Sequence, residues 1–172
     1  MNEVQEWRSI VGFPGYSVSD YGCVRSERVI RKVMTHRILT PTLNTRGIPM
    51  VGINQYGVQY KRSIAVLVAE AFIRSAKSLE FNTPINLDGD RTNNRADNLA
   101  WRPLWFARKY FQQIRSGPQG IGRPVQEMQT KEVFESSWHA ALSYGLIERE
   151  IVFGILNNCY VWPTYQRFRT VS

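Results

Sequence analysis

INLDGDRTNNRADNLAW, residues 85–101, is the stretch of this chain that says most about its fold. Its centre, Asp88-Gly89-Asp90, favours a tight turn, because Asp side chains bond to nearby backbone amides and Gly accepts positive φ angles. The alternative is that Asp88 and Asp90 are oxygen ligands of a divalent metal ion. The asparagines that follow are typical turn and cap residues, which satisfy loose backbone groups; they are Asn93, Asn94 and Asn98.

Helix and strand signals surround this stretch. Ile64–Phe72 is dense in apolar residues and alanine, which predicts a buried helix. Residues 97–101, together with the basic and aromatic run 104–115, indicate a second helix. Upstream, residues 5–62 alternate strand and turn signals: a strand at Tyr16–Ser19, a hairpin over 40–53 and a further turn at 54–57. We expect a small antiparallel sheet there, with arginines on its exposed face.

A second block follows a change in composition. Residues 116–124 hold three glycines and two prolines, which predicts a linker. Residues 125–134 alternate like a strand, and 160–171 indicate a final aromatic strand. Between them, Ser136 and Ser137 cap a short helix over 138–144 that ends at Gly145, and a second helix over 148–156 stops at the Asn157-Asn158 pair.

Two helices joined by a short turn with a glycine are typical of a helix-turn-helix module. The second helix of such a module can enter the major groove of DNA, with its early residues at the base edges. We expect Glu148 and Arg149 to be its exposed residues. The alternative is a small packing module without DNA contact. The buried stripe is predicted to be Ile151, Val152, Ile155 and Leu156.

Composition favours a soluble partner of a polyanion. The 172 residues are 43% hydrophobic and carry a net charge of +8, from 22 Lys and Arg against 14 Asp and Glu, with a pI of about 9.8. Arginine dominates, and its planar fork suits phosphate and guanine edges. The other interpretation is a basic protein kept soluble by self-repulsion. No apolar run could cross a membrane, and the N-terminal residues do not resemble a secretion signal.

Cys23 and Cys159 are too few for a disulfide framework or a zinc site. We expect ordinary buried or half-buried thiols in a reducing compartment. Five tryptophans are predicted to be core residues, with base stacking as the alternative for Trp105; they are Trp7, Trp101, Trp105, Trp138 and Trp162.

Several motifs in order resemble the phage-type HNH homing endonucleases over nearly the whole chain. Glu6–Ile10 and Gly15–Ser26 are similar to the N-terminal module of that family, and Leu67–Phe72 to the helix before its active site. Residues 88–101 resemble its nuclease finger, and the C-terminal block its helix-turn-helix module. The resemblance implies an α+β fold with a small N-terminal antiparallel sheet (1–62), a ββα-metal finger (63–115), a linker (116–124) and a C-terminal helix-turn-helix module flanked by short strands (125–172).

The departures from the family pattern weaken its chemistry. The resemblance implies a histidine general base at Asn86, and an amide is far too weakly basic to take a proton from water near neutral pH. It implies metal-binding side chains near Ile85 and Ala107, which have none to offer a hard cation. A histidine that often opens the preceding helix is replaced by about Ala65. The two histidines of the chain, His36 and His139, lie elsewhere and are expected to have surface, DNA-facing, phosphate-binding or packing roles.

We therefore expect a catalytically inactive HNH-like protein that binds double-stranded DNA with sequence preference, as a monomer without a cofactor, and such binding would suit a regulatory role. The resemblance further implies a phage-encoded protein in the bacterial cytoplasm. One alternative is an active nicking endonuclease that uses Mg²⁺ or Mn²⁺ at a rearranged site around Asn86, Asp88 and Asp90. Another is an adaptor that binds a host or phage protein. The expected DNA contacts are Arg25, Arg28, Arg31, Lys32, Arg46, Arg62, Arg108, Lys109 and Arg149.

Overall fold

The computed structural model describes residues 5–27, 29–30, 33–34 and 36–171. The chain forms two compact units. Unit 1 comprises Met1–Asn86 and Asp90–Pro103, and unit 2 comprises Leu87–Gly89 and Leu104–Ser172. Both mix helices with small antiparallel sheets, as the α+β prediction requires. The two units are defined by contacts between Cα atoms in the folded chain and do not test boundaries along the sequence. The expected four-part division at residues 62, 115 and 124 therefore stays a prediction.

The first sheet of unit 1 has the strand order β1-β2-β3-β6, formed by β1 (Trp7–Ser9), β2 (Tyr16–Ser19), β3 (Val24–Ser26) and β6 (Arg37–Ile38). β4 (Val29–Ile30) pairs with β5 (Val33–Met34) in a separate hairpin. All four residues of β2 are buried. This differs from the half-buried alternation that the sequence predicts. β2 lies between two other strands, and the Ser19 hydroxyl accepts a hydrogen bond from the backbone N–H of Cys23 at 3.0 Å.

The second sheet of unit 1 confirms the predicted hairpins. It contains β7 (Thr42–Leu43), β8 (Pro49–Gln55) and β9 (Val58–Ser63) in that order. The β8–β9 turn places Tyr56 and Gly57 at φ angles of 49° and 83°. Two consecutive positive φ angles are the pattern of a two-residue hairpin turn whose twist matches the strands. Val51 and Ile53 of β8 are fully buried and face the core.

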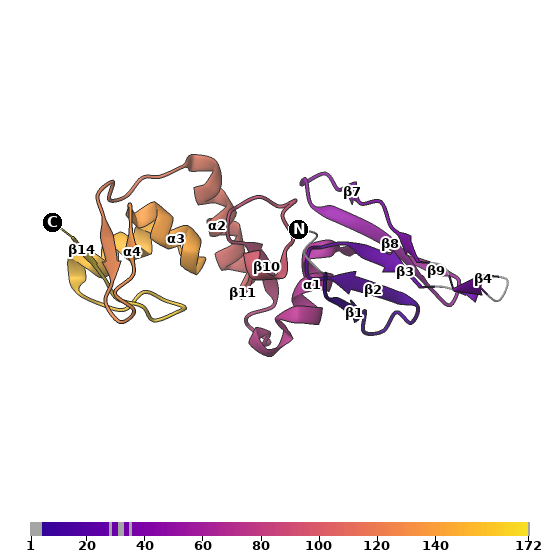
Figure 1. Cartoon of the computed structure of the whole chain (residues 1–172). Coiled ribbons are helices and arrows are strands. Elements are labelled where there is room, and N and C mark those ends of the chain that lie inside the picture. The colour runs from indigo at the N-terminus through magenta and orange to yellow at the C-terminus, as the bar shows by residue number, and fades with distance from the viewer. Residues whose placement is uncertain (1–4, 28, 31–32, 35, 172) are drawn as a thin grey trace. The chain divides into compact units, whose positions relative to one another are not determined.

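Helix α1 (Ile64–Phe72) is the centre of the unit 1 core and confirms the predicted buried helix. It packs against β2, β8 and β9 of the N-terminal sheets and against β10 and β11 (Figure 1). Leu67, Val68 and Ala69 are buried, in one cluster with Val18, Val24 and Trp101. A helix with apolar residues on most of its circumference is stable only when it is covered on most sides, as α1 is here.

The strand pair β10 (Thr83–Asn86) and β11 (Leu99–Arg102) corrects one prediction. Residues 97–101 were expected to belong to the second helix, but residues 99–102 pair antiparallel with β10, with Ile85 opposite Ala100 and Asn86 opposite Leu99. Leu99 and Trp101 alternate into the core, which is the side-chain period of a strand. The 3-10 turns η1 (Arg74–Ala76) and η2 (Ala96–Asn98) lie between α1 and β11.

Unit 2 begins with α2 (Leu104–Ser116) and contains a sheet of order β13-β12-β14, formed by β12 (Val125–Glu127), β13 (Val133–Phe134) and β14 (Phe168–Thr170). Helices α3 (Ser137–Tyr144) and α4 (Glu148–Asn157) cover this sheet. The expected long final strand is short: only Phe168–Thr170 pairs with β12, and an isolated bridge joins Val161 to Gln166.

The predicted ends of α3 and α4 are confirmed. Ser136 is the N-cap of α3 and accepts a hydrogen bond from the backbone N–H of His139. Gly145 ends α3 at φ 59°, and Asn158 ends α4 at φ 51°. Both lie in the left-handed region that Gly and Asn tolerate best. A turn of three residues, 145–147, joins the two helices.

The segment after α2 is held in place, whereas the sequence predicts a linker at 116–124 that is part flexible and part stiff. The backbone N–H of Gln119 donates to Glu148 Oε2 at 2.8 Å, and that of Ile121 donates to Ser137 Oγ at 2.7 Å. A Cβ at Gly120 would lie 2.5 Å from Ser137 Oγ and 2.7 Å from Glu148 Oε1. Only glycine therefore allows this close approach.

Two predictions for α4 were wrong. Glu148, expected to be exposed, is only 4% exposed, because its carboxylate binds the segment after α2. Leu156, expected in the buried stripe, is 76% exposed. The buried face of α4 runs through Glu148, Ile151 and Gly154 instead.

The cysteines follow the prediction, but only one of the five tryptophans expected in the core is fully buried. Trp101 is buried, and Trp7, Trp138 and Trp162 are partly buried, whereas Trp105 is 49% exposed. Both cysteines are half-buried free thiols. Among the described residues, no helix combines the length and the apolar character that a membrane crossing requires.

Candidate functional site

Asn86, at the end of β10, is a structural residue in this fold. It is 3% exposed. Its amide Nδ2 donates to the Asn93 carbonyl at 2.8 Å and to Asn94 Oδ1 at 3.2 Å. These two bonds tie the strand end to the asparagine-rich loop. A group that takes a proton from water must be in contact with that water. The Asn86 amide is buried and uses both N–H groups as hydrogen-bond donors, so it does not reach water.

The loop asparagines continue the same network. Asn98 Nδ2 also donates to the Asn93 carbonyl, at 2.9 Å. Asn94 is buried, and its Nδ2 donates to the carbonyls of Arg91 and Thr92 at 3.2 and 3.3 Å. Each amide therefore supports a backbone group of the loop, which is the role that turn chemistry predicts.

The two carboxylates of the turn differ in their surroundings. Asp90 Oδ1 accepts bonds from Thr92 Oγ1 at 2.7 Å and from the Thr92 backbone N–H at 2.8 Å. These bonds, the side-chain one first, hold the pKa of Asp90 below its ordinary value. Asp88 is exposed and belongs to unit 2. The backbone next to it packs on α2: the Tyr110 hydroxyl donates to the Leu87 carbonyl at 2.5 Å.

The donor atoms near this turn do not fit a divalent metal of the nuclease type. Ile85 is fully buried and Ala107 is 3% exposed, and neither side chain has an oxygen or nitrogen. Ala65 is buried in the core with α1. Asn86 donates its amide N–H groups inward, and Asp90 is bonded to Thr92. Among the residues that the structure describes, no three His, Cys, Asp or Glu side chains form a metal-binding group.

The expected basic contacts of unit 1 fall into three groups. Arg25 is already paired: it lies 2.7 Å from Glu27 and 4.1 Å from the centre of the Trp7 ring. Arg62 lies over Phe13 and Tyr60, at 5.3 and 5.2 Å from the ring centres. Arg46 is exposed in the β7–β8 turn. Arg28, Arg31 and Lys32 lie outside the described residues.

The outward face of the sheet β7-β8-β9 differs from the exposed face with arginines that the sequence predicts. Cross-strand partners share a face, so Gly52 and Lys61 lie together, as do Asn54 and Gln59. Arg62 pairs with Val51 and therefore belongs to the opposite, core-facing side. The outward face is polar and carries Lys61 as its exposed cation. The sequence signal that could have identified this face is the alternation of side chains along β8, in which Val51 and Ile53 face the core.

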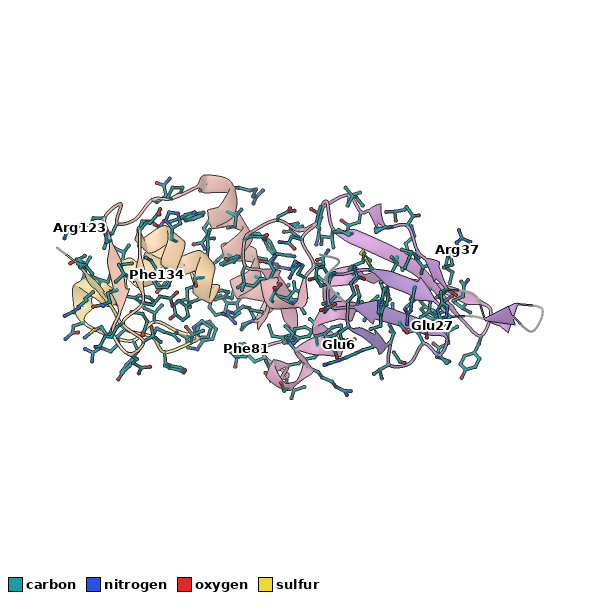
Figure 2. All side chains as sticks on the ribbon, viewed as in Figure 1. Glu6, Glu27, Arg37, Phe81, Arg123 and Phe134 are labelled. Carbon is teal, nitrogen blue, oxygen red and sulfur yellow. The ribbon has the colours of Figure 1, made fainter. Side chains whose placement is uncertain are left out.

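Charge distribution marks the same region. Residues 28–69 contain no Asp or Glu and seven basic residues. This run covers β7, β8, β9 and most of α1. Arg37, one of the seven, projects away from the ribbon, whereas Glu27 lies just before the run (Figure 2). A surface without carboxylates has a positive potential that attracts polyanions. The seven are Arg28, Arg31, Lys32, Arg37, Arg46, Lys61 and Arg62.

Unit 2 brings two of its predicted contacts together. Lys109 of α2 and Arg149 of α4 line one hollow of about 550 Å³, with Gln112, Gln119 and Glu150 among its other walls. The Arg149 guanidinium is 3.6 Å from Glu150, and its side chain is 82% exposed. Lys109 lies 5.3 Å over the ring of Trp105, which stacks on Trp162 at 5.3 Å. Arg108 is exposed on α2.

Neither histidine lies in the nuclease-like turn. His36 is exposed, next to β6 in unit 1. His139 is in α3 of unit 2, where Nδ1 lies 2.9 Å from Ser136 Oγ and Nε2 lies 3.6 Å from Glu135. His139 is thus part of the N-terminal cap of α3.

Comparison with known proteins matches this architecture. Residues 5–54 match the family model of the NUMOD4 motif, a motif found in HNH homing endonucleases. No curated protein sequence matches the chain. Among solved structures, the chain is similar to the one described as "DNA binding and cleavage by the HNH homing endonuclease I-HmuI", with 20% sequence identity and a TM-score of 0.50. The match covers 96% of this chain and 98% of that one. These findings confirm the resemblance for the N-terminal motif and for the fold.

Proposed function

Because the chain carries a NUMOD4 motif on the fold of an HNH homing endonuclease, we propose that it binds double-stranded DNA with sequence preference and does not cut it. The observation that carries the second half is Asn86. It takes the place of the expected general base, it is buried, and its amide is bonded to Asn93 and Asn94. The fold is retained while the group that would activate water is absent.

Both units offer surface for the DNA backbone. In unit 1, the outward face of β7-β8-β9 lies within the carboxylate-free run and carries Lys61, with Arg46 in the adjoining turn. In unit 2, Lys109 and Arg149 share one hollow. Contacts of Lys and Arg to phosphates set the position of a protein on DNA, whereas contacts to base edges read the sequence. A protein that occupies a site without cleaving it would block other DNA enzymes there, which would suit a regulatory role.

Helix α4 is the element that we propose reads bases. Its exposed face carries Arg149, Phe153 and Leu156, spaced along one side of the helix. Glu148 faces inward, so its carboxylate is removed from this face, and Glu150, 3.6 Å from Arg149, is the carboxylate that remains beside it. Arginine suits guanine edges, and apolar side chains contact the methyl group of thymine. Major-groove binding by α4 after the turn at 145–147 is the helix-turn-helix arrangement that the sequence predicts.

A plasmid-nicking assay tests the absence of cleavage. We expect no nicking by the purified chain with Mg²⁺ or Mn²⁺, and none by the Asn86→His variant. One imidazole does not restore a site whose other positions, Ile85 and Ala107, hold no ligand. Metal-dependent nicking by the natural chain that is lost in Asp88→Ala would refute the proposal and establish the rearranged nuclease instead.

Binding itself is tested by its salt dependence. We expect the affinity for duplex DNA to fall at least about 10-fold between 50 and 200 mM salt, since each neutralised phosphate releases counterions. Selection of bound duplexes from a random pool should then return a shared sequence. An affinity that scarcely changes with salt would favour the adaptor function, in which the same surface binds a protein.

A further inference from the structure

The tip of the β8–β9 hairpin holds an unusual residue. Tyr56 is 93% exposed and has a φ of 49°, and Gly57 follows at 83°. A turn of this type is built most easily from Asn-Gly or Asp-Gly, because Asn, Asp and Gly tolerate positive φ best. Tyrosine in this conformation carries a steric cost that asparagine largely avoids.

The fold does not compensate for the steric cost of tyrosine at position 56. A ring that is 93% exposed contributes almost nothing to the core, and exposing an aromatic surface to water is itself unfavourable. Strained residues that do not stabilise the fold cluster at binding sites. The structure therefore presents an aromatic ring at the end of a two-stranded ribbon at a cost to the free protein.

The ribbon behind the ring suits DNA. β8 and β9 contain no acidic residue, and their outward face is polar, with Asn54, Gln59 and Lys61. A Cβ at Gly52 would lie 2.7 Å from the Gln59 amide nitrogen, so the Gln59 side chain lies flat across the ribbon. Two-stranded ribbons fit the major groove, and rings at their ends can reach the base stack.

We propose that Tyr56 is a stacking wedge that inserts at one base step of the bound duplex and separates the two bases there. This inference rests on the proposed DNA binding and names a contact within it. The ring is 93% exposed at the tip of the hairpin, and in the proposed complex the polar ribbon lies along the adjoining groove. The Tyr56 ring would stack on the face of a nucleobase. Every base has such a face, so this contact adds affinity rather than sequence preference.

The test uses variants of the full chain and the duplex recovered by selection from the random pool. In Tyr56→Asn the turn becomes more favourable and the ring is lost. We expect an equal or higher melting temperature together with a DNA affinity that is lower by up to about 150-fold, because the cost of unstacking the base step offsets part of the base–aromatic stack. Tyr56→Phe keeps the ring and should bind like the natural chain. Opposite changes in stability and affinity cannot arise from misfolding.

A matched control lies in unit 2. Tyr165 is also exposed and also has a positive φ, 56°, but it lies outside the acid-free segment. Tyr165→Asn should leave the affinity unchanged. As a direct readout, 2-aminopurine placed along the duplex should brighten at one position on binding of the natural chain, and not on binding of Tyr56→Asn.

The outcomes separate the two proposals. If the natural chain does not bind duplex DNA, both the function and the wedge are overturned. If it binds, and Tyr56→Asn binds equally well without losing a 2-aminopurine signal, the wedge is overturned and the DNA-binding function stands. An equal loss of affinity in Tyr165→Asn would also overturn the special role of the hairpin tip.

Discussion

Replacing Trp101 by alanine is expected to destabilise unit 1 by about 3–5 kcal/mol, the cost of deleting a large buried aromatic side chain. Trp101 is 2% exposed in the core around α1. Its indole Nε1–H donates to the Ile73 carbonyl at 2.9 Å, so the substitution also removes a donor from that backbone group. Natural domains have a free energy of unfolding of about 5–15 kcal/mol, so the variant should lose a large fraction of its stability at 25 °C.

Urea denaturation followed by circular dichroism measures this loss. Trp101→Phe is the control, because it keeps most of the buried ring and removes only the indole donor and part of the volume. We expect it to cost about 1–2 kcal/mol, mainly for the lost hydrogen bond. A free energy of unfolding for Trp101→Ala within 1 kcal/mol of the natural chain would contradict the position of Trp101 in the core.

Replacing Glu148 by alanine is expected to destabilise unit 2 by about 2–4 kcal/mol, because hydrogen bonds to a charged group contribute about 1.5–3 kcal/mol each. The carboxylate accepts bonds from the backbone N–H of Gln119 and from Ser137 Oγ, both at 2.8 Å. It also lies in the first turn of α4, where a negative charge is favourable. Its loss should free the segment 117–123 that it holds.

Amide hydrogen exchange at Gln119 and Ile121 measures the release of this segment. Glu148→Gln retains one acceptor oxygen in the same shape and should lose about half as much stability. If these amides exchange in the alanine variant at the natural rate, the segment after α2 is held by other contacts and the interpretation is wrong.

These two residues also show how far the sequence could be interpreted. Trp101 was expected in the core, and its apolar size alone favours burial. Glu148 was expected on the surface, because a carboxylate is rarely buried without a partner. Its partners, Gln119 and Ser137, are supplied by a glycine-rich segment and by another helix. No pattern of residues close to Glu148 in the sequence predicts such a set of contacts.

The same division applies to the rest of the fold. Features that depend on neighbours in the chain were predictable: the Ser136 cap, the ends of helices at Gly145 and Asn158, and the hairpin turn before Val58. Residues 99–102 became a strand because β10 and α1 cover them, although their composition also suits a helix.

The amide at position 86 is written in the sequence, and with it the absence of a base where the family resemblance implies one. Only the tertiary structure decided that this amide is buried and bonded to two loop residues, that Lys61 rather than Arg62 faces outward from the ribbon, and that Tyr56 stands exposed at its tip. The physical reason is that residue chemistry and turn preferences are local, whereas burial and the facing of a side chain depend on which distant segments pack against it.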